Sequence, residues 1–160
     1  MSIKELVSKA DGGIVLLPGE DKAFSAGGST IRLKATGKDT GGAWSLTEFE
    51  LPPRFIEAAP PPHVHTREDE AFLVIEGTIT IELDQRMVKA PAGSFVFSPK
   101  GVVHKFSNPE AEPAKLYIIS SPAGLEDFFV ELYEVLQLPP PPDIPKIMAL
   151  FQKYGMEVKM

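Results

Sequence analysis

Proline and glycine interrupt this chain so often that only short regular elements fit between them. The 160 residues include 16 prolines and 13 glycines, and several of the intervening stretches alternate apolar and polar residues. Such alternation is typical of half-buried strands. The expected strands are residues 14–17, 30–36, 43–51, 71–76, 78–83, 86–90, 94–98, 102–107 and 114–120. Many short strands separated by turn signals predict an all-β core, an antiparallel sandwich or small barrel.

The C-terminal part of the chain has a different pattern. Apolar residues recur at helical spacing over 125–136 and again over 144–154, which predicts two helices packed outside the barrel. Ser121 followed by proline is the expected start of the first helix, Asp143 the cap of the second and Gly155 its end. A short amphipathic helix is also expected in residues 1–11. We therefore expect one domain over residues 1–160, with the barrel at about 12–120 and the helical segment at about 121–160.

Composition excludes several classes of function. The chain has 22 acidic residues against 16 lysines and arginines, a net charge of -6, which disfavours nucleic acid as a partner. It has no cysteine, so thiolate metal sites and cysteine nucleophiles are excluded. Neither a secretory signal nor a run of apolar residues long enough to span a bilayer is present. These features predict a cytoplasmic protein that acts without a membrane.

All three histidines of the chain, His63, His65 and His104, lie within residues 60–108. In a strand His63 and His65 point to the same side, which supplies half of a metal site. Glu70 has the opposite parity to His65, so residues 66–69 must bend before its carboxylate can join the histidines. His104 would come from a neighbouring strand. Three imidazoles and one carboxylate suit a divalent transition metal, and Fe, Mn, Ni, Co, Zn and Cu are all compatible with these ligands.

Each of these signals has a simpler explanation when it is taken alone. A His-x-His pair in a loop is more often solvated than metal-bound, and a single histidine or glutamate in a polar run carries little information. The joint spacing makes the metal site the better hypothesis.

That spacing resembles the two sequence motifs of the cupin superfamily. The first motif, G-x5-H-x-H-x3,4-E-x6-G, matches His63, His65, Glu70 and Gly77, although its opening glycine would fall at Glu57. The second motif, G-x5-P-x-G-x2-H-x3-N, matches at every position, with Gly93, Pro99, Gly101, His104 and Asn108. The stretches PPPHVHTREDEAFLVIEG, FVFSPKGVVHKFSN, SPAGLEDFF and KYGMEV also resemble single-domain proteins of the quercetin 2,3-dioxygenase-like group.

The resemblance implies a double-stranded β-helix, a jelly-roll-like barrel, with one metal inside and helices outside. It implies that His63, His65, Glu70 and His104 hold the metal and that Glu70 also acts as a catalytic base. A homodimer is the expected assembly.

Three functions follow as hypotheses. The leading one is a metal-dependent dioxygenase of quercetinase type acting on a small aromatic, enolisable substrate. The second is an isomerase or lyase that uses the metal as a Lewis acid, and the third is a non-catalytic cupin that binds a small ligand.

The cavity walls are expected to be apolar. Strand parity places Phe72 and Val74 inside if Glu70 faces inward, and Val102 and Phe106 inside if His104 does. Phe95, Phe97 and Trp44 are further candidates for the wall.

Overall fold

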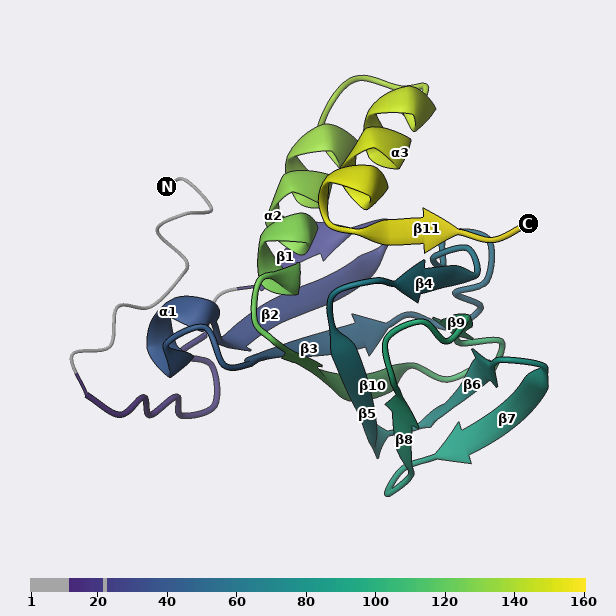
Figure 1. Cartoon of the computed structure of the whole chain (residues 1–160). Helices are drawn as coiled ribbons and strands as arrows, with labels where there is room; N and C mark the ends of the chain where they lie inside the picture. Colours follow the sequence, from purple (N-terminus) through teal and green to yellow (C-terminus); the bar gives the residue numbers. More distant parts are fainter. Residues whose placement is uncertain (1–11, 22) are drawn as a thin grey trace.

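Two antiparallel sheets face each other in a computed structural model of the chain, which describes residues 12–21 and 23–160 (Figure 1). The six-stranded sheet has the order β1-β2-β3-β10-β5-β8, and the five-stranded sheet has the order β11-β4-β9-β6-β7. The prediction of an all-β core with C-terminal helices is confirmed. The helix expected in residues 1–11 lies outside the described residues.

The first sheet contains strands from both ends of the barrel sequence. Its central strands β3, β10 and β5 carry buried residues at every second position, among them Phe49, Leu51, Phe72, Leu116 and Ile118. The six strands are β1 (Ala23–Ala26), β2 (Ser29–Ala35), β3 (Ser45–Leu51), β5 (Asp69–Glu76), β8 (Phe95–Ser98) and β10 (Ala114–Ser121).

The second sheet contains the strands with the histidines. β4 pairs with β9 through a single residue pair, His63 opposite His104, and with β11 along its whole length. Ile79, Ile81 and Phe106 of this sheet point into the same core as the first sheet. The strands are β4 (His63–His65), β6 (Thr78–Leu83), β7 (Arg86–Pro91), β9 (His104–Ser107) and β11 (Met156–Val158).

Two helices, α2 (Leu125–Leu136) and α3 (Ile144–Lys153), form a hairpin that packs on the open side of the barrel (Figure 1). Phe128 of α2 contacts Phe151 and Tyr154 edge-to-face, with ring centroids 5.2 and 5.8 Å apart. The chain then returns as β11 beside β4. A one-turn helix, α1 (Gly37–Thr40), connects β2 and β3.

Most expected strands are present within a few residues of their predicted bounds, but the segment 14–17 is not a strand. Val15 is 79% exposed and Leu17 59%, and the chain turns back at Glu20, whose carboxylate accepts the Leu17 amide. An apolar run becomes a strand only where a neighbouring strand satisfies its backbone groups, and no strand among residues 12–21 and 23–160 pairs with this run. The short strands β1 and β11 were not predicted.

The predicted start of the first helix at Ser121 is also wrong. Ser121 is the last residue of β10, and its hydroxyl donates to the Ala43 carbonyl. The helix begins only at Leu125 after Gly124. The prediction for the second helix is confirmed, since Asp143 accepts the Lys146 amide at 3.0 Å and Gly155 follows its last turn.

The motif glycine Gly77 is required by a close approach between two chain segments. Its φ is +70°, and a Cβ at this position would lie 2.4 Å from the Pro113 carbonyl oxygen. Glycine alone permits both the backbone conformation and the approach.

No helix in the described part of the chain combines the length and the hydropathy needed to cross a membrane.

Candidate functional site

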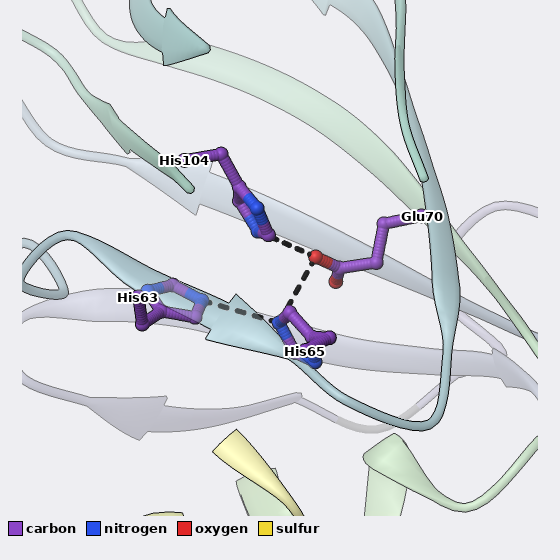
Figure 2. Close-up of side chains that lie close together, drawn as sticks. All are labelled: His63, His65, Glu70 and His104. Atoms are coloured by element: carbon purple, nitrogen blue, oxygen red, sulfur yellow. Dashed lines mark hydrogen bonds and ion pairs between the residues drawn. The ribbon is translucent and has the colours of Figure 1, made fainter. Parts of the chain in front are cut away.

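Both sheets contribute to one cluster of buried side chains, His63, His65, Glu70 and His104 (Figure 2). β4 and β9 of the five-stranded sheet carry the histidines, and β5 of the six-stranded sheet carries Glu70. The predicted bend between His65 and Glu70 is present, because β4 ends at His65 and β5 begins at Asp69. This bend moves the chain from one sheet to the other, so Glu70 reaches the histidines from the facing sheet.

The four side chains point their donor atoms at one another. His63 Nε2 lies 3.1 Å from His65 Nε2, and Glu70 Oε2 lies 3.1 Å from His65 Nε2 and 2.8 Å from His104 Nε2. One donor atom from each residue can be chosen so that all four lie within 4.8 Å of one another. Donors that bind one ion at about 2.0–2.2 Å are separated by roughly 3–3.5 Å, so the cluster has the dimensions of a metal site.

The far nitrogen of each imidazole is held in place. His63 Nδ1 donates to the Pro61 carbonyl at 2.7 Å, and His104 Nδ1 lies 3.1 Å from the Val102 carbonyl and 3.0 Å from Ser98 Oγ. A hydrogen bond at Nδ1 fixes the ring orientation and directs the Nε2 lone pair into the cluster.

The Nε2 atom of His104 is buried and makes no well-aligned hydrogen bond, although Glu70 is close. A buried polar atom without a hydrogen bond is uncommon and requires an explanation. A metal ion that accepts this lone pair would provide one. The residues therefore fit a divalent transition metal, while their type leaves its identity open.

Burial and the neighbouring charges determine the protonation of the metal-free cluster. Burial lowers the pKa of His63 to about 4, and electrostatic repulsion from the neighbouring His104 and His65 adds to this effect. Burial also opposes a charge on His65, but the carboxylates of Glu70 and Glu68 outweigh it and raise the pKa of His65 to about 9.

Burial by itself would raise the pKa of Glu70, but His65 and His104 hold it well below its usual range. The metal-free site thus keeps a proton on His65 and a negative charge on Glu70. A metal cation would replace that proton.

The cluster forms the inner end of a cavity of about 450 Å³. The remaining wall is mostly apolar and comes from the inner faces of both sheets, from residues 57–61 and from the helix hairpin. Phe106 is part of this wall, as predicted. Phe72 and Val74 are buried in the core but are not among the residues that line the cavity, so their prediction as wall residues is wrong; the Phe72 ring centroid lies 5.7 Å from that of His104. The hairpin supplies Leu125, Phe128, Phe129, Leu132, Leu136, Ile144, Ile147 and Phe151.

The prediction that Phe95 or Phe97 belongs to the wall is wrong. These side chains are 62% and 49% exposed on the outer face of β8. β8 pairs with β5 so that Phe97 is opposite Ala71 and Ser98 is opposite Glu70, which turns Ser98 inward and both phenylalanines outward.

Two further candidates for the wall also lie outside it. Trp44 is 42% exposed, and Val102 is half-buried and contributes its carbonyl group to the His104 interaction rather than a wall.

Sequence reasoning missed the residues that contact the histidines from behind. Glu68 and Ser98 contact His65 and His104, yet both fall at positions that the two motifs leave unspecified. It also missed the hairpin as a wall of the cavity, because its apolar stripes were interpreted only as packing surface.

Asn108, the last residue of the second motif, has a structural role. Its side-chain amide is fully buried, donates to the carbonyls of Pro52 and Glu112 at 3.0 and 2.9 Å, and accepts the Glu110 amide at 3.1 Å. These bonds hold the turn after β9 against the end of β3.

Comparison with known proteins gives a family match over slightly less than half of the chain. Residues 48–120 match the family model described as "Cupin domain". A protein of Aquifex aeolicus (strain VF5) named "Uncharacterized protein" is 35% identical over 80 residues, which cover 49% of this chain and 65% of that relative. The match thus spans less than two thirds of the relative.

Two solved structures share the fold. KdgF from Halomonas sp. has a TM-score of 0.63 at 17% identity and covers 72% of this chain and 99% of its own. An RmlC-like cupin from Shewanella frigidimarina NCIMB 400 has a TM-score of 0.60 at 20% identity and covers 73% of this chain and 96% of its own. At these identities the likeness concerns the fold alone.

Proposed function

We propose that this chain, whose fold is that of the cupin superfamily, is a metal-dependent dioxygenase of the quercetin 2,3-dioxygenase type that acts on a small aromatic, enolisable substrate. His63, His65, Glu70 and His104 would hold the metal, and Glu70 would also act as the catalytic base. The observation that carries the proposal is the position of this buried cluster at the inner end of an apolar cavity.

The composition of the cavity wall favours an uncharged, apolar substrate. Its volume of about 450 Å³ falls in the range of small-molecule sites. Within the described residues, no lysine or arginine contributes to the wall, and Glu57 is the one charged residue there besides the cluster. A phosphate or carboxylate group that entered the cavity away from the metal would find no cation to pair with, and its desolvation there would be uncompensated.

Phe106, Phe129 and Phe151 add flat apolar surface to the wall. Phe151 also contacts His63 edge-to-face, with ring centroids 6.0 Å apart, so an aromatic surface continues up to the metal ligands. An aromatic substrate would stack on these rings while its oxygen-bearing edge faced the cluster.

A bound divalent metal would polarise an oxygen of the substrate and support its reaction with dioxygen. The chain itself would position the substrate, exclude water and move one proton. Glu70 uses one of its two carboxylate oxygens, Oε2, toward both His65 and His104, and neither of these ion pairs involves the second oxygen (Figure 2). That second oxygen would accept the hydroxyl proton of the substrate, which leaves the substrate as an enolate and Glu70 as a neutral acid.

Oxygen consumption tests the proposal directly. The metal-free chain is reconstituted with each of Fe, Mn, Co, Ni, Cu and Zn and mixed with a flavonol. Metal-dependent oxygen uptake together with loss of the flavonol is expected with at least one metal. Equal turnover under anaerobic conditions would replace the dioxygenase with an isomerase or lyase. Thermal stabilisation by the flavonol without any product would indicate a binding protein instead.

The proposal retains the cytoplasmic homodimer that the sequence predicts. Light scattering of the purified chain would give twice the chain mass of 17.4 kDa if the dimer forms.

A further inference from the structure

One buried carboxylate near the cluster occupies a position that neither sequence motif specifies. Glu68 lies between β4 and β5, is only 5% exposed, and places Oε2 3.3 Å from His65 Nδ1. Among the described residues, its hydrogen bond and ion pair are both with His65. Burying a carboxylate costs several kcal/mol unless its partner compensates. A fold that buries this group against one imidazole therefore depends on that contact.

The three imidazoles differ in what holds their far nitrogen. A backbone carbonyl holds His63, and a carbonyl and a hydroxyl hold His104, whereas a carboxylate holds His65. Neutral acceptors orient a ring, but a carboxylate also increases the electron density at the opposite nitrogen. His65 is thus the imidazole whose Nε2 lone pair should bind a cation most strongly.

Charge balance adds a second argument. With neutral histidines the four cluster residues carry one negative charge, that of Glu70, and Glu68 supplies another. A divalent ion with both carboxylates gives a neutral group. Neutrality matters because the surrounding cavity is apolar, and a net charge there would be poorly solvated.

Residues outside the two motifs hold the segment that carries Glu68 in place. Thr66 donates to the Gly155 carbonyl from its amide at 2.9 Å and from its hydroxyl at 2.6 Å, and Arg67 donates to the Lys153 carbonyl at 3.1 Å. Gly155 has φ +71°, and a Cβ there would lie 2.7 Å from both Thr66 Oγ1 and Arg67 Nε. The end of the helix hairpin thus holds the 66–68 segment in the position that brings Glu68 to His65.

We propose that Glu68 is a positioning residue of the metal centre, which as a carboxylate orients His65 and balances the second charge of a divalent ion. This inference rests on the proposed metal site. Glu68 would act through His65 and would not touch the metal or the substrate.

Metal titration of substituted chains tests the role of Glu68. Glu68→Ala, which removes both the charge and the hydrogen bond, is expected to weaken Co²⁺ binding by about 10- to 100-fold in calorimetry. Glu68→Gln keeps an acceptor for His65 Nδ1 and is expected to fall between Glu68→Ala and the parent. Both variants should also shift the visible absorption bands of bound Co²⁺, a change that loss of stability alone would not produce.

Glu126→Gln provides a matched control. Glu126 is also a glutamate with 5% exposure, but it accepts the amides of Gly37 and Gly124 at 2.7 Å and lies outside the cavity wall. Its substitution should lower thermal stability and leave the Co²⁺ affinity and absorption bands unchanged. If Glu68→Ala bound Co²⁺ as tightly as the parent, the positioning role would be wrong and the metal site would stand. If the parent itself bound no metal, both proposals would fail.

Discussion

The two ends of the cavity are built in opposite ways. At the inner end, side chains from β4, β5 and β9 converge, and hydrogen bonds hold the far nitrogen of every imidazole. At the outer end, side-chain packing around Phe128, Leu150 and Phe151 forms the wall from α2 and α3, and the polar contacts between the two helices, from Glu131 to Lys153 and Tyr154, involve residues that do not line the cavity. Directional bonds fix atoms to a few tenths of an ångström, whereas packing fixes mainly volume. The inner end therefore determines the chemistry, and the outer end determines which molecule reaches it.

The largest expected effect comes from removing a donor at the inner end. His104→Ala should weaken metal binding by at least about 100-fold, because loss of a direct ligand exceeds the 10- to 100-fold effect of an outer-layer residue. The fold should persist, since the core beneath His104 is formed by Phe72 and Phe106. Calorimetric titration with Co²⁺ and circular dichroism measure the two properties. Unchanged affinity would rule out the three-histidine site.

A charge at the outer end should separate substrate binding from metal binding. Ile147 of α3 is half-buried and contributes to the cavity wall. Ile147→Arg should weaken binding of a flavonol by roughly 10-fold or more, because a charged group would be desolvated beside an apolar ligand. The metal content should stay at the parent level. Quenching of the intrinsic fluorescence on addition of the flavonol measures the affinity.

The neighbouring residue provides the control for this experiment. Met148 is 42% exposed and contributes nothing to the cavity wall, so Met148→Arg should bind the flavonol like the parent. Equal weakening by both substitutions would mean that the hairpin affects binding only through general stability.

The smallest effect is expected on the outer face of β8. Phe97→Ser should change metal affinity and flavonol affinity by less than about twofold, because exposed substitutions away from a site usually alter the free energy by about 0.5 kcal/mol or less. A large loss in either titration would show that β8 contributes to the cavity after all.

The four ligands at the inner end could be predicted from the sequence because their positions depend on short spacings along the chain. Strand parity gave the common direction of His63 and His65 and required the bend before Glu70. The second motif added His104 from the adjacent strand. Each of these steps depends on spacing along one or two strands, and spacing is visible in a sequence.

The residues around the four ligands and the short terminal strand could not be predicted in the same way. The inward direction of Ser98 and the outward direction of Phe97 depend on the register between β5 and β8, and a shift of one residue reverses both. β11 is only three residues long and pairs with a strand about ninety positions earlier. Neither fact leaves a periodic signal. Glu68 was missed because a buried carboxylate and an exposed one look alike in a polar run.

The metal content of the parent chain tests the central claim most directly. The protein is stripped with a chelator, reconstituted separately with Fe, Mn, Co, Ni, Cu and Zn, freed of excess ion and subjected to elemental analysis. The arrangement of His63, His65, Glu70 and His104 predicts about one tightly held ion per chain with at least one of these metals. A chain that retained none of the six would contradict the account.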